Sequence, residues 1–83
     1  MESDPWLGTM WVVYAKPTDF PNSYIARKWV DGLATNDVMI APNRFAMSQK
    51  ISELGPMGQH PVFKADDPHI VAKYIVDTPL VIL

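Results

Sequence analysis

Two apolar segments separated by a proline-containing loop set the pattern of the first third of the chain. Residues 10–15 place Trp, two Val and Tyr in succession, a composition typical of a β-strand. Residues 24–30 resume this strand pattern. Between the two segments, Pro17 and Pro21 lack the backbone N–H that a strand ladder needs, so residues 16–23 are expected to form a loop.

The first of these strands is apolar on both of its faces. Because side chains alternate along a strand, Trp11 and Val13 are expected on one face, and Val12 and Tyr14 on the other. This arrangement is typical of a central strand, or of a strand whose second face meets another surface.

Turn signals delimit a hairpin and a third strand. Asp31-Gly32 favours a tight turn with positive φ, directly after the second strand. A third strand is predicted over residues 36–41, and Pro42 ends it.

One helix is predicted, over residues 43–54. Asn43 can cap its first free N–H groups, and Gly55-Pro56 supplies the stop. The apolar side chains at i, i+4 and i+7 form one stripe, while Phe45 lies nearly opposite to it. The stripe consists of Met47, Ile51 and Leu54.

The last third holds a connection, a strand and an apolar tail. Residues 55–68 are rich in Pro and Gly, with Val62 and Phe63 as a brief extended piece, and a strand is predicted over residues 69–76. Residues 1–9 are expected to be a flexible lead-in, and residues 79–83 an apolar tail or an extra strand. We therefore predict a single α+β domain of order β-β-β-α-β: a mostly antiparallel sheet with one helix packed on one face.

The size of the helix limits how much of the sheet it can cover. Three turns measure roughly 17 Å by 10 Å, which masks part of one face. The second face then needs another cover: the proline-containing loops, the apolar tail, a second copy of the chain, or a different partner. Because large apolar patches are uncommon on monomers, we expect a homodimer.

Composition narrows the classes of function. The chain has 83 residues and no cysteine, which excludes disulfides and thiolate metal sites. Its net charge is −2, and it has no cluster of basic residues of the kind that binds nucleic acid. No apolar run approaches the length of a membrane span, and the N-terminal segment is acidic. We expect a soluble cytoplasmic protein with no membrane partner.

The densest group of titratable residues is Asp66-Asp67-Pro68-His69. Two carboxylates and an imidazole can bind a metal or share acid–base chemistry, and His60 lies in the preceding loop. Asp before Pro is, however, more typical of a turn in which the carboxylate accepts backbone N–H bonds. The spacing fits no metal signature, and no nucleophile or phosphate-loop motif is present. We therefore expect no enzyme activity, no catalytic residue, no metal and no cofactor.

Aromatic residues beside a cationic side chain favour a protein interface. Trp, Tyr and Arg dominate interface hot spots, so the predicted interaction surface centres on Arg27 and neighbouring strand residues. Its full set is Trp11, Val13, Arg27, Trp29 and the tail residues Leu80, Val81, Ile82 and Leu83. The alternative is a sheet that stacks single-stranded nucleic acid with help from Arg27 and Lys28.

Three blocks of sequence carry a resemblance to a family. They are W-V-V-Y-x-x-P-T-D-F-P-N-x-Y-I-A-R-K-W, D-V-M-I-A-P-N and A-D-D-P-H-I-V. This combination, over residues 11–43 and 65–72, resembles small uncharacterised proteins of bacteriophages and prophages of proteobacteria. The chain departs from that pattern in the helix and in residues 55–64.

The resemblance implies a phage or prophage context and supplies no activity and no functional residues. Small phage proteins of this kind often bind and block host proteins. We therefore expect a non-enzymatic protein-interaction module, homodimeric or bound to a host protein. The alternative that the context suggests is a phage-encoded inhibitor of a host defence complex.

Overall fold

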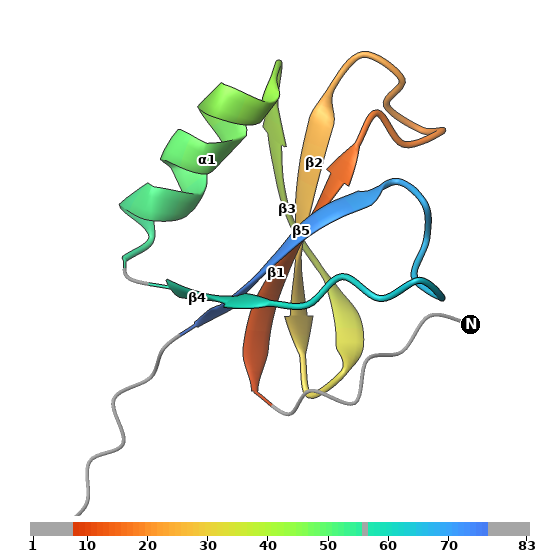
Figure 1. Ribbon diagram of the computed structural model, residues 1–83. Coiled ribbons are helices and arrows are strands. Elements are labelled where there is room, and N and C mark those ends of the chain that lie inside the picture. The colour runs from red at the N-terminus through yellow and green to blue at the C-terminus, as the bar shows by residue number, and fades with distance from the viewer. Residues whose placement is uncertain (1–7, 56, 77–83) are drawn as a thin grey trace, which may run out of the picture.

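The computed structural model describes residues 8–55 and 57–76, which form one five-stranded sheet and one helix (Figure 1). The elements are, in order, β1 (Thr9–Ala15), β2 (Tyr24–Val30), β3 (Leu33–Ala41), α1 (Arg44–Glu53), β4 (Met57–His60) and β5 (Ile70–Val76). The predicted class, α+β with an antiparallel sheet and one helix, is confirmed.

The sheet has the strand order β3-β2-β1-β5-β4, and each paired neighbour is antiparallel. β1, β2 and β3 form a meander, and the chain then returns through α1 to place β5 on the other side of β1. β1 is therefore the central strand, as its two apolar faces predict.

Two elements differ from the expected boundaries. β3 begins at Leu33, because the tight turn pairs Val30 directly with Leu33. The short extra strand is Met57–His60, whereas Val62 and Phe63 lie outside any strand.

The β2–β3 turn is also hydrogen-bonded to Gly8, directly before β1. Asp31 and Gly32 have φ values of 51° and 83°, so the predicted positive-φ turn is confirmed. Gly8 donates its N–H to Asp31 Oδ1 at 2.8 Å, and Asp31 donates its own N–H to the Gly8 carbonyl at 2.8 Å.

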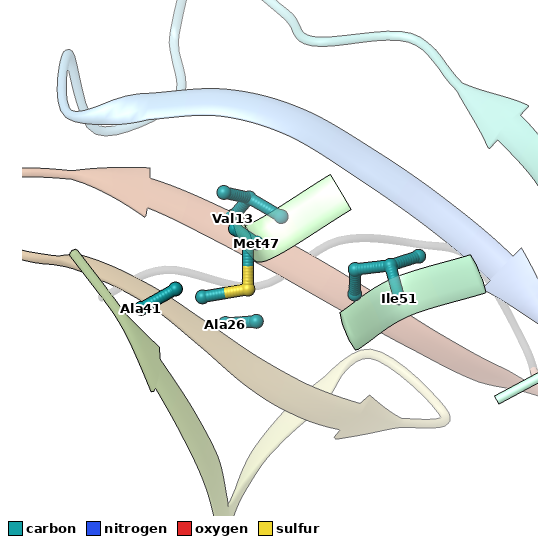
Figure 2. Close-up of a cluster of buried hydrophobic side chains, with 5 residues drawn as sticks. All are labelled: Val13, Ala26, Ala41, Met47 and Ile51. Atoms are coloured by element: carbon teal, nitrogen blue, oxygen red, sulfur yellow. The ribbon is translucent and has the colours of Figure 1, made fainter. Parts of the chain in front are cut away.

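The helix packs its buried residues on one face of the sheet. Asn43 caps it, since its Oδ1 accepts the Ala46 N–H at 2.8 Å. Met47 and Ile51 join a buried cluster whose sheet members are Val13, Ala26 and Ala41 (Figure 2). The predicted stripe is thus buried at its first two positions, whereas Leu54 is about half exposed and Phe45 points away from the core with 72% exposure.

The second face carries a separate apolar cluster. Its buried members are Met10, Val12, Trp29 and Ile70. Over β5, this face is covered by the connection that follows β4.

Lys73 holds this connection against the sheet. It is 3% exposed, pairs its Nζ with Asp66 Oδ2 at 2.8 Å, and lies 4.8 Å from the ring centroid of Phe63. His60 contacts the same ring edge-on. One of the proline-containing loops, rather than a second molecule, therefore covers this part of the face.

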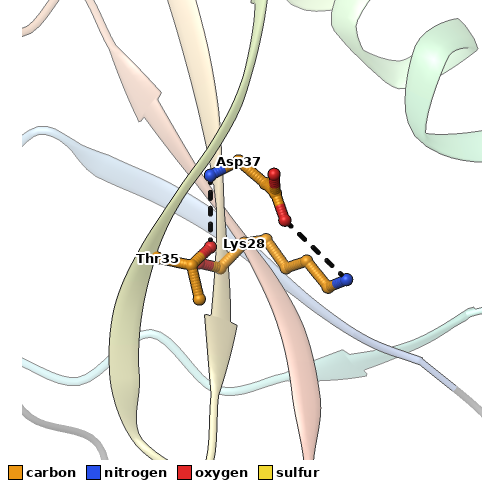
Figure 3. Close-up of polar contacts among 3 residues, drawn as sticks. All are labelled: Lys28, Thr35 and Asp37. Atoms are coloured by element: carbon orange, nitrogen blue, oxygen red, sulfur yellow. Dashed lines mark hydrogen bonds and ion pairs between the residues drawn. The ribbon is translucent and has the colours of Figure 1, made fainter.

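A β-bulge interrupts the outer strand of the sheet. The pairing of β2 with β3 shifts between Arg27 and Trp29, and Thr35 compensates by donating its hydroxyl to the Lys28 carbonyl at 2.7 Å. The same hydroxyl accepts the Asp37 N–H at 3.3 Å, and Lys28 Nζ lies 4.0 Å from Asp37 Oδ2 (Figure 3).

Candidate functional site

A cavity of about 320 Å³ opens at one end of the second face. Four segments supply its walls: β1, β2, the 16–23 loop, and the turn before β5. It is lined by Tyr14, Pro17, Thr18, Asp19, Phe20, Ile25, Arg27, Asp67 and His69. This volume lies at the lower end of the range of small-molecule sites.

Backbone bonds hold the 16–23 loop over the strand ends. Lys16 donates its N–H to the Ser23 carbonyl at 2.9 Å, which closes the loop. Within it, Phe20 donates to the Pro17 carbonyl at 2.9 Å and Ser23 donates to the Phe20 carbonyl at 3.2 Å. These turns place Phe20, which is 42% exposed, in the cavity wall.

Asp67 and His69 form the opposite wall as a compact turn. Asp67 Oδ1 accepts the His69 backbone N–H at 2.8 Å and lies 2.9 Å from His69 Nδ1. Asp66, its neighbour, instead accepts the Phe63 N–H at 2.7 Å and pairs with Lys73. The Asp66-Asp67-Pro68-His69 segment thus acts as a turn whose two carboxylates have different partners.

The described residues include no group of three or more His, Asp or Glu side chains placed to hold a metal ion. In the two described ranges, no helix is long and apolar enough to cross a membrane.

Arg27 is the one cation in the cavity lining that has no acidic partner within the described chain. Its Nη1 donates to the Thr35 carbonyl at 2.7 Å, which is a neutral acceptor. A guanidinium has five N–H donors, so this bond leaves most of its capacity for a ligand.

An apolar strip lies beside Arg27 on the same face. Residues paired across antiparallel strands share a face, and β3 places Val38 opposite Arg27 and Ile40 opposite Ile25. Val38 is 38% and Ile40 50% exposed. We call Arg27, Val38 and Ile40 the open patch; it continues into the cavity through Ile25 and Arg27.

The strand register divides the residues expected to form one interaction surface. Val13 pairs with Ala26 and Trp11 with Lys28, which puts Trp11 and Val13 on the helix face. Arg27 and Trp29 lie on the second face, opposite Val12 and Met10.

Burial separates these residues further. Val13 and Trp29 are buried, and the indole N–H of Trp29 has no hydrogen-bond partner among the described residues. Trp11 packs against the helix-side cluster. Of the four strand residues expected at the interface, Arg27 is therefore the one that lies on the accessible part of the second face. The tail residues Leu80–Leu83 lie outside the described residues.

The grouping of these residues into one site was not predicted. Val38 and Ile40 alternate with Met39 in the sequence, which indicates a shared face but not which neighbours that face meets. Phe20, Tyr14 and His69 converge from three segments, and no sequence spacing brings such segments together.

Arg27 and Lys28 do not form one basic surface. They alternate along β2, so Arg27 faces the second side of the sheet while Lys28 lies with Trp11 on the helix side. This separation removes the paired cations on which the nucleic-acid alternative depends.

No family model, no curated protein and no solved structure matches the chain.

Proposed function

We propose that this chain is a non-enzymatic protein-interaction module that works as a homodimer, with the open patch at its interface. The observation that supports this proposal is the unequal cover of the second face. The chain itself covers this face over β5, whereas the part formed by β2 and β3 exposes Val38 and Ile40.

The two halves differ because of the connection before β5. Phe63 and Asp66 lie over Lys73, whereas no described segment lies over Ile40, which stays half exposed. Burying an aliphatic side chain stabilises a complex by about 1 to 2 kcal/mol, so neighbouring Val38 and Ile40 provide a useful apolar centre. Arg27 beside them adds a residue type that is enriched at interface hot spots.

We propose contact through the face of the sheet rather than through its outer edge. The free edge of β3 is interrupted by the bulge at Thr35, with the charged Asp37 next to it. Bulges and charges are the features that prevent strands from pairing between molecules. A two-fold axis through the open patch brings the same apolar residues of both copies together.

The test is the solution mass, measured by light scattering, of the natural protein and of two matched variants. We expect the natural protein to be a dimer and Ile40→Asp to be a monomer, because a carboxylate at the centre of the interface must lose its hydration. Phe45→Asp is the control: Phe45 is more exposed than Ile40 but belongs to α1 and not to the open patch. A monomeric natural protein, or equal loss of mass in both variants, would disprove the proposal.

The resemblance to small phage proteins adds a biological setting to this proposal. In that setting the dimer acts in the cytoplasm of the infected or lysogenic host. Expression of the gene after induction of a prophage, measured at the transcript level, tests the setting separately from the dimer.

A further inference from the structure

We infer that the cavity at the end of the second face binds a small acid with one carboxylate on an aromatic or branched apolar body. This inference shares Arg27 with the proposed dimer interface but rests on the cavity, and its test reads ligand binding rather than the mass of the protein in solution. A volume of about 320 Å³ accommodates a single ring with a short acidic substituent.

Arg27 is the group of the lining that can bind an anion. Arg27 carries the positive charge, and its one hydrogen bond goes to the neutral Thr35 carbonyl at 2.7 Å. Asp67 lies 2.9 Å from His69 Nδ1 and also accepts the His69 N–H, so its carboxylate is engaged within its own turn. A carboxylate ligand supplies the charge-assisted partner that Arg27 does not have within the described chain.

The same lining disfavours a doubly charged ligand. Asp19 and Asp67 both belong to the wall, and their negative charges oppose a second anionic charge close to Arg27. A monoanionic carboxylate is balanced by one guanidinium, whereas a phosphate dianion is not. Carboxylate is therefore the expected headgroup.

The remaining wall is suited to an apolar body. Tyr14 and Phe20 provide aromatic surface from β1 and from the loop, and Ile25 is a buried aliphatic residue of β2. Aromatic rings favour offset or edge-to-face contact with another ring. A flat ring held between these side chains and a carboxylate held by Arg27 satisfy both parts of the site.

The experiment is a titration of ¹⁵N-labelled protein with sodium phenylacetate, followed by amide chemical shifts. We expect saturable shifts at the lining residues, with phenylacetamide, the neutral analogue, binding at least about tenfold more weakly. Arg27→Met is expected to weaken phenylacetate binding by about tenfold or more. Lys28→Met is the matched control, because this cation lies on the opposite face; its affinity should stay unchanged.

Three results would overturn the inference: no saturable shifts at the lining residues, equal binding of acid and amide, or equal affinity in Arg27→Met and the natural protein. If Arg27→Met fails to fold, the comparison of acid with amide decides by itself. N-acetyl-Glu-Phe-amide separates the sources of the carboxylate. Binding of this peptide without binding of phenylacetate would overturn the assignment to a small acid and place a partner's acidic side chain there.

Discussion

At the scale of single residues, the buried Lys73 shows how a charge fixes the position of a loop. Its ammonium group lies in the middle of β5 on the second face, where burial disfavours an unpaired charge. Asp66, from the connection, supplies the carboxylate at 2.8 Å, and Phe63 supplies an aromatic ring. The connection is therefore held over β5 by electrostatic and packing contacts together.

This ion pair leads to a prediction on stability. Asp66→Asn removes the charge that compensates Lys73 and should lower the free energy of unfolding by roughly 3 kcal/mol, because it leaves an ammonium group buried. Asp66→Asn combined with Lys73→Met should recover much of this loss, since the methionine fills similar volume without charge. Urea denaturation followed by tryptophan fluorescence measures both effects.

Asp37→Asn is the control for the loss of one carboxylate. Asp37 belongs to the exposed Lys28–Asp37 pair, where the atoms are 4.0 Å apart and the Asp37 side chain is 69% exposed. Solvent screens such a pair, so we expect a loss below about 0.5 kcal/mol. Similar losses for Asp66→Asn and Asp37→Asn would show that the buried Lys73 does not depend on Asp66.

At the scale of elements, strands and helix follow from local signals, but the assignment of faces does not. The proline-containing loop, the Asp31-Gly32 turn and the Asn43 cap mark their elements in the sequence, and the structure places each where predicted. Whether Trp11 shares a face with Arg27 depends instead on the pairing register of β1 and β2. That register is set by tertiary contacts, and a shift of one residue exchanges the faces.

The bulge in β3 and the strand Met57–His60 escaped prediction for similar reasons. The bulge depends on the Thr35 hydroxyl reaching the Lys28 carbonyl, a contact between strands that no single segment encodes. β4 is short and contains Gly58, a residue with low strand preference, so pairing with β5 is what makes it a strand. The cavity forms only where the paired strands β1 and β2, the 16–23 loop and the turn before β5 come together, and these contacts are also long-range.

The helix cap gives a prediction at this scale. Asn43→Ala removes the acceptor for the Ala46 N–H and should destabilise the protein by about 1 kcal/mol. Asn22→Ala, in the exposed 16–23 loop, is the matched control and should change stability little. Thermal unfolding followed by circular dichroism compares the two; an equal fall in Tm for both variants would mean that the cap contributes nothing specific.

At the scale of the whole molecule, the five-stranded sheet of the described residues separates two apolar clusters that are covered in different ways. α1 covers the cluster that includes Val13, and the connection before β5 covers part of the cluster that includes Val12. A chain of this size buries only about 60% of the surface that it exposes when unfolded, so each cover contributes noticeably to a small total stability. The part that no described segment covers, the open patch, is where we propose that the dimer forms.

The most direct test of this account is an isotope-filtered NOE experiment on a mixed sample of ¹³C-labelled and unlabelled protein. Such an experiment detects contacts between copies only. We expect intermolecular NOEs at the methyl groups of Val38 and Ile40. Intermolecular NOEs confined to Leu80–Leu83, or none at concentrations where the natural protein is a dimer by mass, would contradict it.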